Sequence, residues 1–119
     1  MQTLADVLRA NVITEAVTSA PFEVPARRRM IFTLPVNSNL MSDVRLVGSV
    51  NSMGGMGGQI EAIVADGGTV VWRSGRAVQI PINVALPPKS GAYQLIFDNG
   101  PSLLFGRTVS GSVQLIYVR

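Results

Sequence analysis

The chain has 119 residues, which predicts a single domain, and its formal charge of +3 is only mildly basic. It contains no histidine and no cysteine, so it lacks the commonest general base, the thiol nucleophile, disulfides and the usual transition-metal ligands. A hydrolase would need paired carboxylates, a Ser–Lys pair or a metal instead. We therefore expect a protein that is not an enzyme, has no cofactor and does not bind nucleic acid.

Charged residues make up 14% of the chain and hydrophobic residues 47%, so some apolar surface is expected to face a partner. A second copy of the same chain is the first candidate partner. No apolar run approaches the roughly 20 residues of a membrane span, so no transmembrane segment is predicted. The N-terminus also lacks the basic and apolar regions of a secretory signal, which makes the cytoplasm the default location.

The N-terminal residues 1–20 are predicted to form a short helix and an arm. Thr3 is a good N-cap, Asp6 lies near the positive end of the helix dipole, and the helix is expected to end at Ala10. The β-branched residues from Val12 to Val17 favour a first strand at a sheet edge. The rest of the chain, residues 21–119, is predicted to be one β-sandwich.

Alternating apolar residues predict the strands of that sandwich. We expect Pro35 to end regular pairing, and Pro81 to lie at an edge or a bulge because proline has no amide hydrogen. The dipeptide Asp66-Gly67 predicts a hairpin turn. The apolar residues that share a face are, in chain order, Met30, Phe32 and Leu34; Val44, Leu46 and Val50; and Val78, Ile80, Ile82, Val84 and Leu86.

The segment from Asn51 to Gly58 is rich in glycine and is interpreted as a flexible connection. A phosphate-binding loop would need a helix after its glycines, whereas Gln59 and a predicted strand follow here. Met53 and Met56 are candidates to cover an apolar patch or to contact a partner.

Three residues near one turn, Trp72, Arg73 and Arg76, together with the glycine-rich loop 54–58, are candidates for binding a glycan or a lipid head group. The alternative is that Trp72 anchors the core, since tryptophan contributes a large apolar area. The run 27–29 of three arginines is interpreted as the solvated start of a strand, with contact to phosphate or anionic lipid as the alternative.

Two alternating strands are predicted from Gly91 to Tyr117, joined as a hairpin by a polar corner that contains Asp98, Asn99 and Ser102. Asp98 and Asn99 are expected to cap backbone amides there, and calcium ligation is the less favoured alternative. The apolar residues expected on one face are Tyr93, Leu95 and Phe97 in the first strand, and Val109, Val113, Leu115 and Tyr117 in the second.

This ending resembles the C-terminal signature of the Golgi-dynamics (GOLD) domain. The matching residues run from Tyr93 to Asn99, then Ser102, Arg107-Thr108-Val109 and Val113-Gln114-Leu115. The resemblance implies a GOLD-like β-sandwich, similar to the domain outside the membrane in transmembrane cargo receptors, and it implies protein–protein recognition. Gly100, Arg107 and Ile96 depart from the usual residues of the family.

The sequence thus predicts an all-β protein, an antiparallel sandwich or jelly roll of about seven to nine strands with one short N-terminal helix. The expected function is a non-enzymatic module for protein–protein contacts, with self-association foremost. The alternative is a module that binds glycan or lipid head groups.

Overall fold

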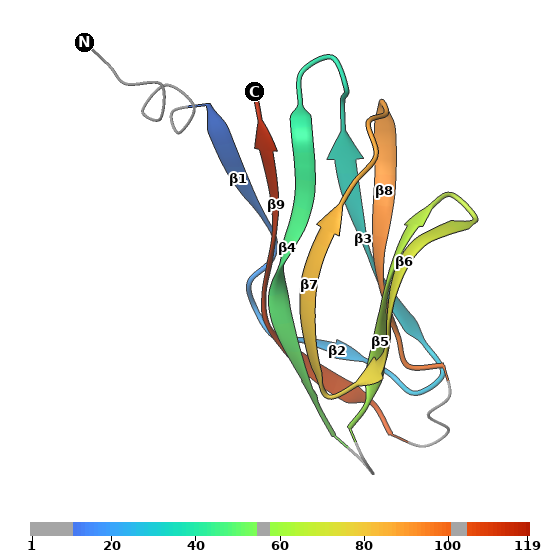
Figure 1. The fold of residues 1–119 in the computed structure, drawn as a ribbon. Coiled ribbons are helices and arrows are strands. Elements are labelled where there is room, and N and C mark those ends of the chain that lie inside the picture. Colours follow the sequence, from blue (N-terminus) through green and yellow to red (C-terminus); the bar gives the residue numbers. More distant parts are fainter. Residues whose placement is uncertain (1–10, 55–57, 101–104) are drawn as a thin grey trace.

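The computed structural model describes residues 11–54, 58–100 and 105–119, and these residues form nine strands and no helix (Figure 1). The predicted helix from Thr3 to Ala10, Met56 and Ser102 lie outside the described residues. Two antiparallel sheets contain the strands. Sheet A consists of β1 (Val12–Thr18), β2 (Phe22–Val24), β4 (Ser42–Met53), β7 (Gln79–Ala85) and β9 (Arg107–Val118). Sheet B consists of β3 (Arg29–Val36), β5 (Ile60–Asp66), β6 (Thr69–Ala77) and β8 (Gly91–Asp98).

The strand order is β1-β9-β4-β7 in sheet A, where β2 also pairs with β9, and β3-β8-β5-β6 in sheet B. Figure 1 shows the two sheets as two layers, with the β2–β3 turn and the starts of β5 and β9 at the lower end. The predicted Asp66-Gly67 hairpin is confirmed, because Asp66 pairs with Thr69 across a two-residue loop in which Gly67 has a φ of 59°. The edge strand predicted from Val12 to Val17 is confirmed as β1.

The prediction that the last two strands form a hairpin is wrong, because β8 and β9 belong to different sheets. In sheet B, β8 already pairs with β3 on one side and β5 on the other. In sheet A, β9 pairs with β4 on one side and with both β1 and β2 on the other. Both strands therefore have both edges filled, and the polar corner carries the chain from one layer to the other.

The hydrophobic core lies between the sheets and contains the faces that the alternation predicts in β4, β7, β8 and β9. Each of these strands has one face in the core, which is why period two is so clear in their sequences. The rings of Phe22, Phe32 and Phe97 pack edge to face or tilted, with centroids 5.1 to 6.1 Å apart, and join the two sheets. Val78 departs from the prediction, because it precedes β7 and is exposed.

Five of the described strands lie at sheet edges: β2 has only three residues, and β1, β3, β6 and β7 each carry a feature that hinders the addition of another strand. Pro81 lies in edge strand β7, as predicted. The prediction that Pro35 ends regular pairing is wrong, because Pro35 lies inside edge strand β3 and pairs with Ala92. Strand β6 has two register shifts. Strand β1 has one register shift, and it also carries Glu15, which accepts a hydrogen bond from the buried Tyr117. Proline, bulges and inward charges are the usual protections of sheet edges.

Candidate functional site

The outer faces of the two sheets differ in chemistry. Towards the lower end, the outward residues of β4 and β9 are hydroxyl and amide side chains such as Ser49, Asn51 and Ser112, which suit contact with water. On sheet B, isoleucines occupy the middle of the outer face: Ile31 pairs with Ile96, which pairs with Ile63. Sheet B therefore presents a row of aliphatic side chains in the middle of its outer face.

We call the residues Ile31, Ile63, Ala65, Val70 and Ile96 the aliphatic patch. Ile63, Ala65 and Ile96 form a small buried cluster that is separate from the main core. On either side of this cluster, Ile31 on β3 is 55% exposed and Val70 on β6 is 47% exposed. The patch thus has a packed floor and two aliphatic side chains that remain open to solvent.

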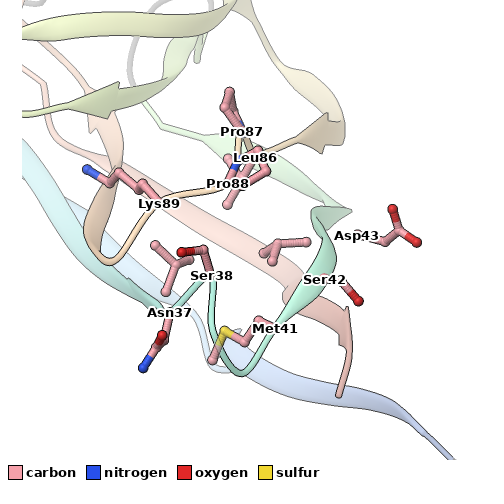
Figure 2. A pocket seen from close by; sticks show the side chains of 11 residues that line it. Asn37, Ser38, Met41, Ser42, Asp43, Leu86, Pro87, Pro88 and Lys89 are labelled. Carbon is pink, nitrogen blue, oxygen red and sulfur yellow. The ribbon is translucent and has the colours of Figure 1, made fainter.

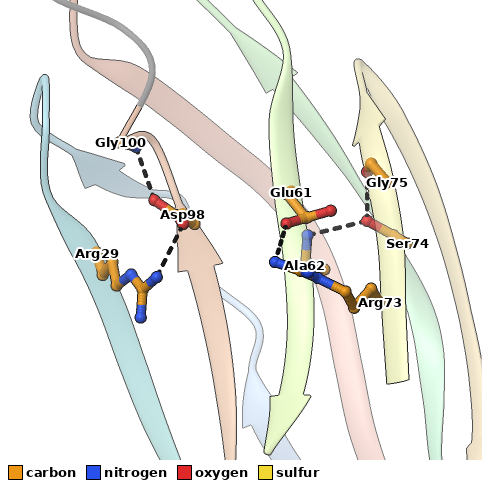
Figure 3. Close-up of polar contacts among 8 residues, drawn as sticks. All are labelled: Arg29, Glu61, Ala62, Arg73, Ser74, Gly75, Asp98 and Gly100. Atoms are coloured by element: carbon orange, nitrogen blue, oxygen red, sulfur yellow. Dashed lines mark hydrogen bonds and ion pairs between the residues drawn. The ribbon is translucent and has the colours of Figure 1, made fainter. Parts of the chain in front are cut away.

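Two ion pairs border the aliphatic patch at the end of the sheet where β3 begins and β8 ends. Figure 3 draws both pairs. Arg29 Nη2 lies 3.2 Å from Asp98 Oδ2, and Arg73 Nη2 lies 3.2 Å from Glu61 Oε1. The acids are on the inner strands β8 and β5, and the arginines are on the outer strands β3 and β6. Exposed pairs of this kind contribute only about 0 to 1 kcal/mol, so their main effect is to leave this surface without excess charge.

A bulge in β6 sets the direction of Arg73. The hydroxyl of Ser74 accepts a hydrogen bond from the Ala62 amide at 2.9 Å and donates to the Gly75 carbonyl at 2.6 Å, as Figure 3 shows. Gly75 has a φ of 74°, a conformation that glycine adopts readily. Arg73 consequently pairs with Ile63 on the outer face.

The predicted ligand residues of β6 do not form one cluster. Trp72 pairs with Val64 and is half-buried against the main core, whereas Arg73 joins the outer ion pair. Arg76 turns to the lower end, where its Nη2 donates to the Gln59 carbonyl at 3.0 Å. Trp72 and Arg73 do border a groove of about 270 Å³ between β6 and β7, which Ile80 also lines.

The other predicted contact residues lie apart from the patch. Met53 ends β4 at the lower end, is 66% exposed and borders a hollow of about 390 Å³. In the arginine run, Arg27 has a φ of 63° in the turn before β3, and Arg29 is the member that pairs with Asp98. Pairing within the protein accounts for Arg29 without a bound anion.

At the polar corner, the side chains of Asp98 and Asn99 make different contacts. Asp98 Oδ1 accepts from the Gly100 amide at 2.7 Å, which is the predicted capping contact. Asn99 is fully buried and donates instead, from Nδ2 to the carbonyls of Val24 (3.0 Å), Pro25 (3.3 Å) and Phe105 (3.0 Å). Asn99 therefore ties the end of β2 to the segment before β9.

A narrow hollow lies at the opposite end of the sandwich, between the loops that follow β3 and β7 (Figure 2). Its volume of about 20 Å³ suits one water molecule rather than a ligand. The Ser38 amide donates to the Lys89 carbonyl across it, and Lys89 also pairs with Asp66. These contacts close this end of the sandwich.

Two tyrosines in this half of the molecule have perturbed acidities. Burial raises the pKa of Tyr93, the carboxylate of Asp66 adds to the rise, and Lys89 opposes it. The pKa of Tyr117 is raised mainly by the hydrogen bond that its hydroxyl donates to Glu15. Both phenols are hydrogen-bonded structural groups: Tyr93 donates to the Pro87 carbonyl at 2.6 Å and Tyr117 to Glu15 at 2.7 Å.

Among the described residues, no three acidic side chains gather into a cluster that could hold a metal ion. The same residues include no helix of the length and apolarity needed to cross a membrane. The sequence matches no protein-family model and no curated protein. The resemblance to the GOLD domain stays a prediction.

Sequence reasoning missed the aliphatic patch as a site. The available signal was the unbroken apolar run from Ala62 to Ala65, because a strand that is apolar on both faces is covered on both. The partners Ile31 and Ile96 depend on the order of strands in sheet B, which periodicity does not contain.

Proposed function

We propose that this chain is a non-enzymatic interaction module that associates with a second copy of itself through the outer face of sheet B. The observation that carries the proposal is the aliphatic patch, in which exposed Ile31 and Val70 flank a buried aliphatic floor. Apolar surface of this kind, bordered by polar groups, is typical of protein contacts. The GOLD-like ending supports the same class of function, since that family acts through protein recognition.

The edges and charges of the molecule favour a face-to-face contact with an identical partner. Strand addition is disfavoured by the prolines and bulges of the edge strands. The two ion pairs beside the patch balance their own charges, so a second copy is not repelled and a partner of opposite charge is not required.

The test is sedimentation velocity of the wild type and two variants over a wide range of concentrations. Ile31→Glu places a charge in the proposed interface and is expected to weaken association at least tenfold, since a residue that dominates an interface contributes about 2 kcal/mol or more. Leu40→Glu is the matched control, because Leu40 is an equally open aliphatic residue, 62% exposed, in the loop after β3. A wild type that stays monomeric throughout, or equal weakening by both variants, would refute the proposal.

The second candidate function is binding of a glycan or lipid head group, and the groove beside Trp72 and Arg73 favours it. Its volume of about 270 Å³ is near the lower limit for small-ligand sites. Trp72 is the sole tryptophan, so its fluorescence reports on the groove directly. A screen of glycans and phospholipid vesicles that leaves the emission of Trp72 unchanged would leave this residue with a packing role alone.

A further inference from the structure

The outer face of sheet B is ordered into rows of side chains that cross its four strands. The strand register defines these rows, and neighbouring rows are two residues apart along β3 and β8. From the lower end upward, the charged row contains Arg29, Asp98, Glu61 and Arg76; the isoleucine row contains Ile31, Ile96, Ile63 and Arg73; and the neutral row contains Thr33, Gln94, Ala65 and Val70.

The charged groups of this face gather on one side of the isoleucines. Arg73 belongs to the isoleucine row, but its Nη2 reaches Glu61 of the charged row at 3.2 Å. The arginines are the outermost of the paired groups: the side chains of Arg29 and Arg73 are 55% and 58% exposed, against 16% and 17% for their acids. A partner that covers the face therefore meets cations on one side of the isoleucines and neutral side chains on the other.

Two copies of this face can meet in two ways about a two-fold axis. Such symmetric pairs are the commonest homo-oligomers, and aligned sheets that pack face to face keep their strand directions within about 30° of each other. The axis then runs either along the strands or across them, parallel to the isoleucine row. An axis along the strands places each row against the same row of the partner, whereas an axis across the strands reverses the order of the rows.

Charge disfavours the axis along the strands. With the two faces in full overlap, Asp98 would lie against the partner's Glu61 and Arg29 against the partner's Arg76. Like charges that face each other across an interface are strongly unfavourable. With the axis along the isoleucine row, the charged row lies against the partner's neutral row, in which the Thr33 hydroxyl and the Gln94 amide can form hydrogen bonds with charged groups.

We propose that the second copy docks with its strands antiparallel to those of the first, about a two-fold axis that follows the isoleucine row. This geometry rests on the self-association proposed above, and it adds which residues meet. It covers the exposed Ile31 with the partner's Ile31. It also places Arg29 opposite the partner's Thr33, and this contact occurs twice because both copies contribute the same surface.

A charge at Thr33, an exposed position, tests the geometry by the sign of its effect on association. Thr33→Glu is expected to strengthen association about fivefold, because each dimer gains two ion pairs with Arg29. Thr33→Lys is expected to weaken association by a similar factor, and Arg29→Gln added to Thr33→Glu should abolish the gain. Sedimentation velocity measures these variants, with Leu40→Glu as the control for a charge added outside the interface.

The distance between two spin labels gives an independent measurement, because the chain has no cysteine that would compete with an introduced one. Val36, five residues after Ile31, ends β3, and Leu40 lies in the loop beyond it. Five residues of strand span about 17 Å, so labels on Leu40→Cys should be about 35 Å or more apart in antiparallel copies. With the axis along the strands, both labels would lie at the same end of the dimer, within about 25 Å of each other.

The outcomes separate the geometry from the self-association on which it rests. A wild type that stays monomeric refutes both. A dimer that Ile31→Glu weakens but Thr33→Glu also weakens, or one in which the Leu40→Cys labels are within about 25 Å of each other, overturns the antiparallel docking and leaves the self-association in place.

Discussion

Gly48 on β4 lies so close to β9 that a side-chain Cβ at this position would be 2.1 Å from the carbonyl oxygen of Ser112. The closeness is mutual, because a Cβ on Gly111 of β9 would be 2.3 Å from the carbonyl oxygen of Ser49. The two longest strands of sheet A therefore approach each other closely at the pair Ser49–Ser112, which the two glycines flank.

Gly48→Ala is expected to lower the free energy of unfolding by about 3 kcal/mol, because backbone atoms of a central strand must move to admit the methyl group. Gly68→Ala is the control, since a Cβ there meets nothing within 4 Å, and its effect should stay within about 0.5 kcal/mol. Urea unfolding measures both variants. Similar losses for both would show that the close approach does not matter.

Asn99→Asp is expected to destabilise the fold by about 3 kcal/mol or more. The substitution keeps the shape of the side chain, but it removes the amide donor and points a carboxylate at the carbonyls of Val24, Pro25 and Phe105. Asn83→Asp, at an exposed position beside Arg45, should be nearly neutral. Equal stability of the two variants would exclude a role for Asn99 in tying β2 to the segment before β9.

Ser74→Ala is expected to lower the free energy of unfolding by about 1 to 2 kcal/mol, since it leaves the amide of fully buried Ala62 without its acceptor. Ser112→Ala on the exposed face of sheet A provides a matched comparison. Amide hydrogen exchange gives the sharper measurement, because the Ala62 amide itself should lose protection. Unchanged exchange at Ala62 would contradict the role assigned to the bulge.

Stability is expected to fall at alkaline pH. The pKa of Tyr93 is higher in the folded protein than its unfolded value of about 10, so the stability that it contributes is complete below about pH 10 and is lost as the pH rises through the folded pKa. Tyr117 acts in the same direction through Glu15. Urea unfolding at several pH values above 9 should show a flatter decline in Tyr93→Phe than in the wild type. An identical decline would exclude Tyr93 as a cause.

The local features of this fold were predictable from the sequence, and the pairing of strands was not. Tyr93, Leu95 and Phe97 recur at every second position because β8 covers the core with one face, and this period is visible in the sequence. Whether β8 pairs with β9 depends on which other strands fill its edges. The corner at Asp98 and Asn99 suits a hairpin and a crossover equally well.

Because the order of strands could not be predicted, the residues that come together at the candidate sites could not be predicted either. Ile31, Ile96 and Ile63 are separated by more than thirty residues in the sequence, and only the order of β3, β8 and β5 places them in one row. Trp72 stands out in the sequence because it is the sole tryptophan, yet its position on β6 turns it toward the core.

The protected edges of the described strands have a consequence for behaviour at high concentration. A molecule that associates through one face, and whose described edge strands hinder strand addition, stops growing once two faces have met, whereas an unprotected edge would allow a cross-β ladder to continue. We therefore expect concentrated solutions to contain discrete particles of fixed size and to resist seeding by fibrils.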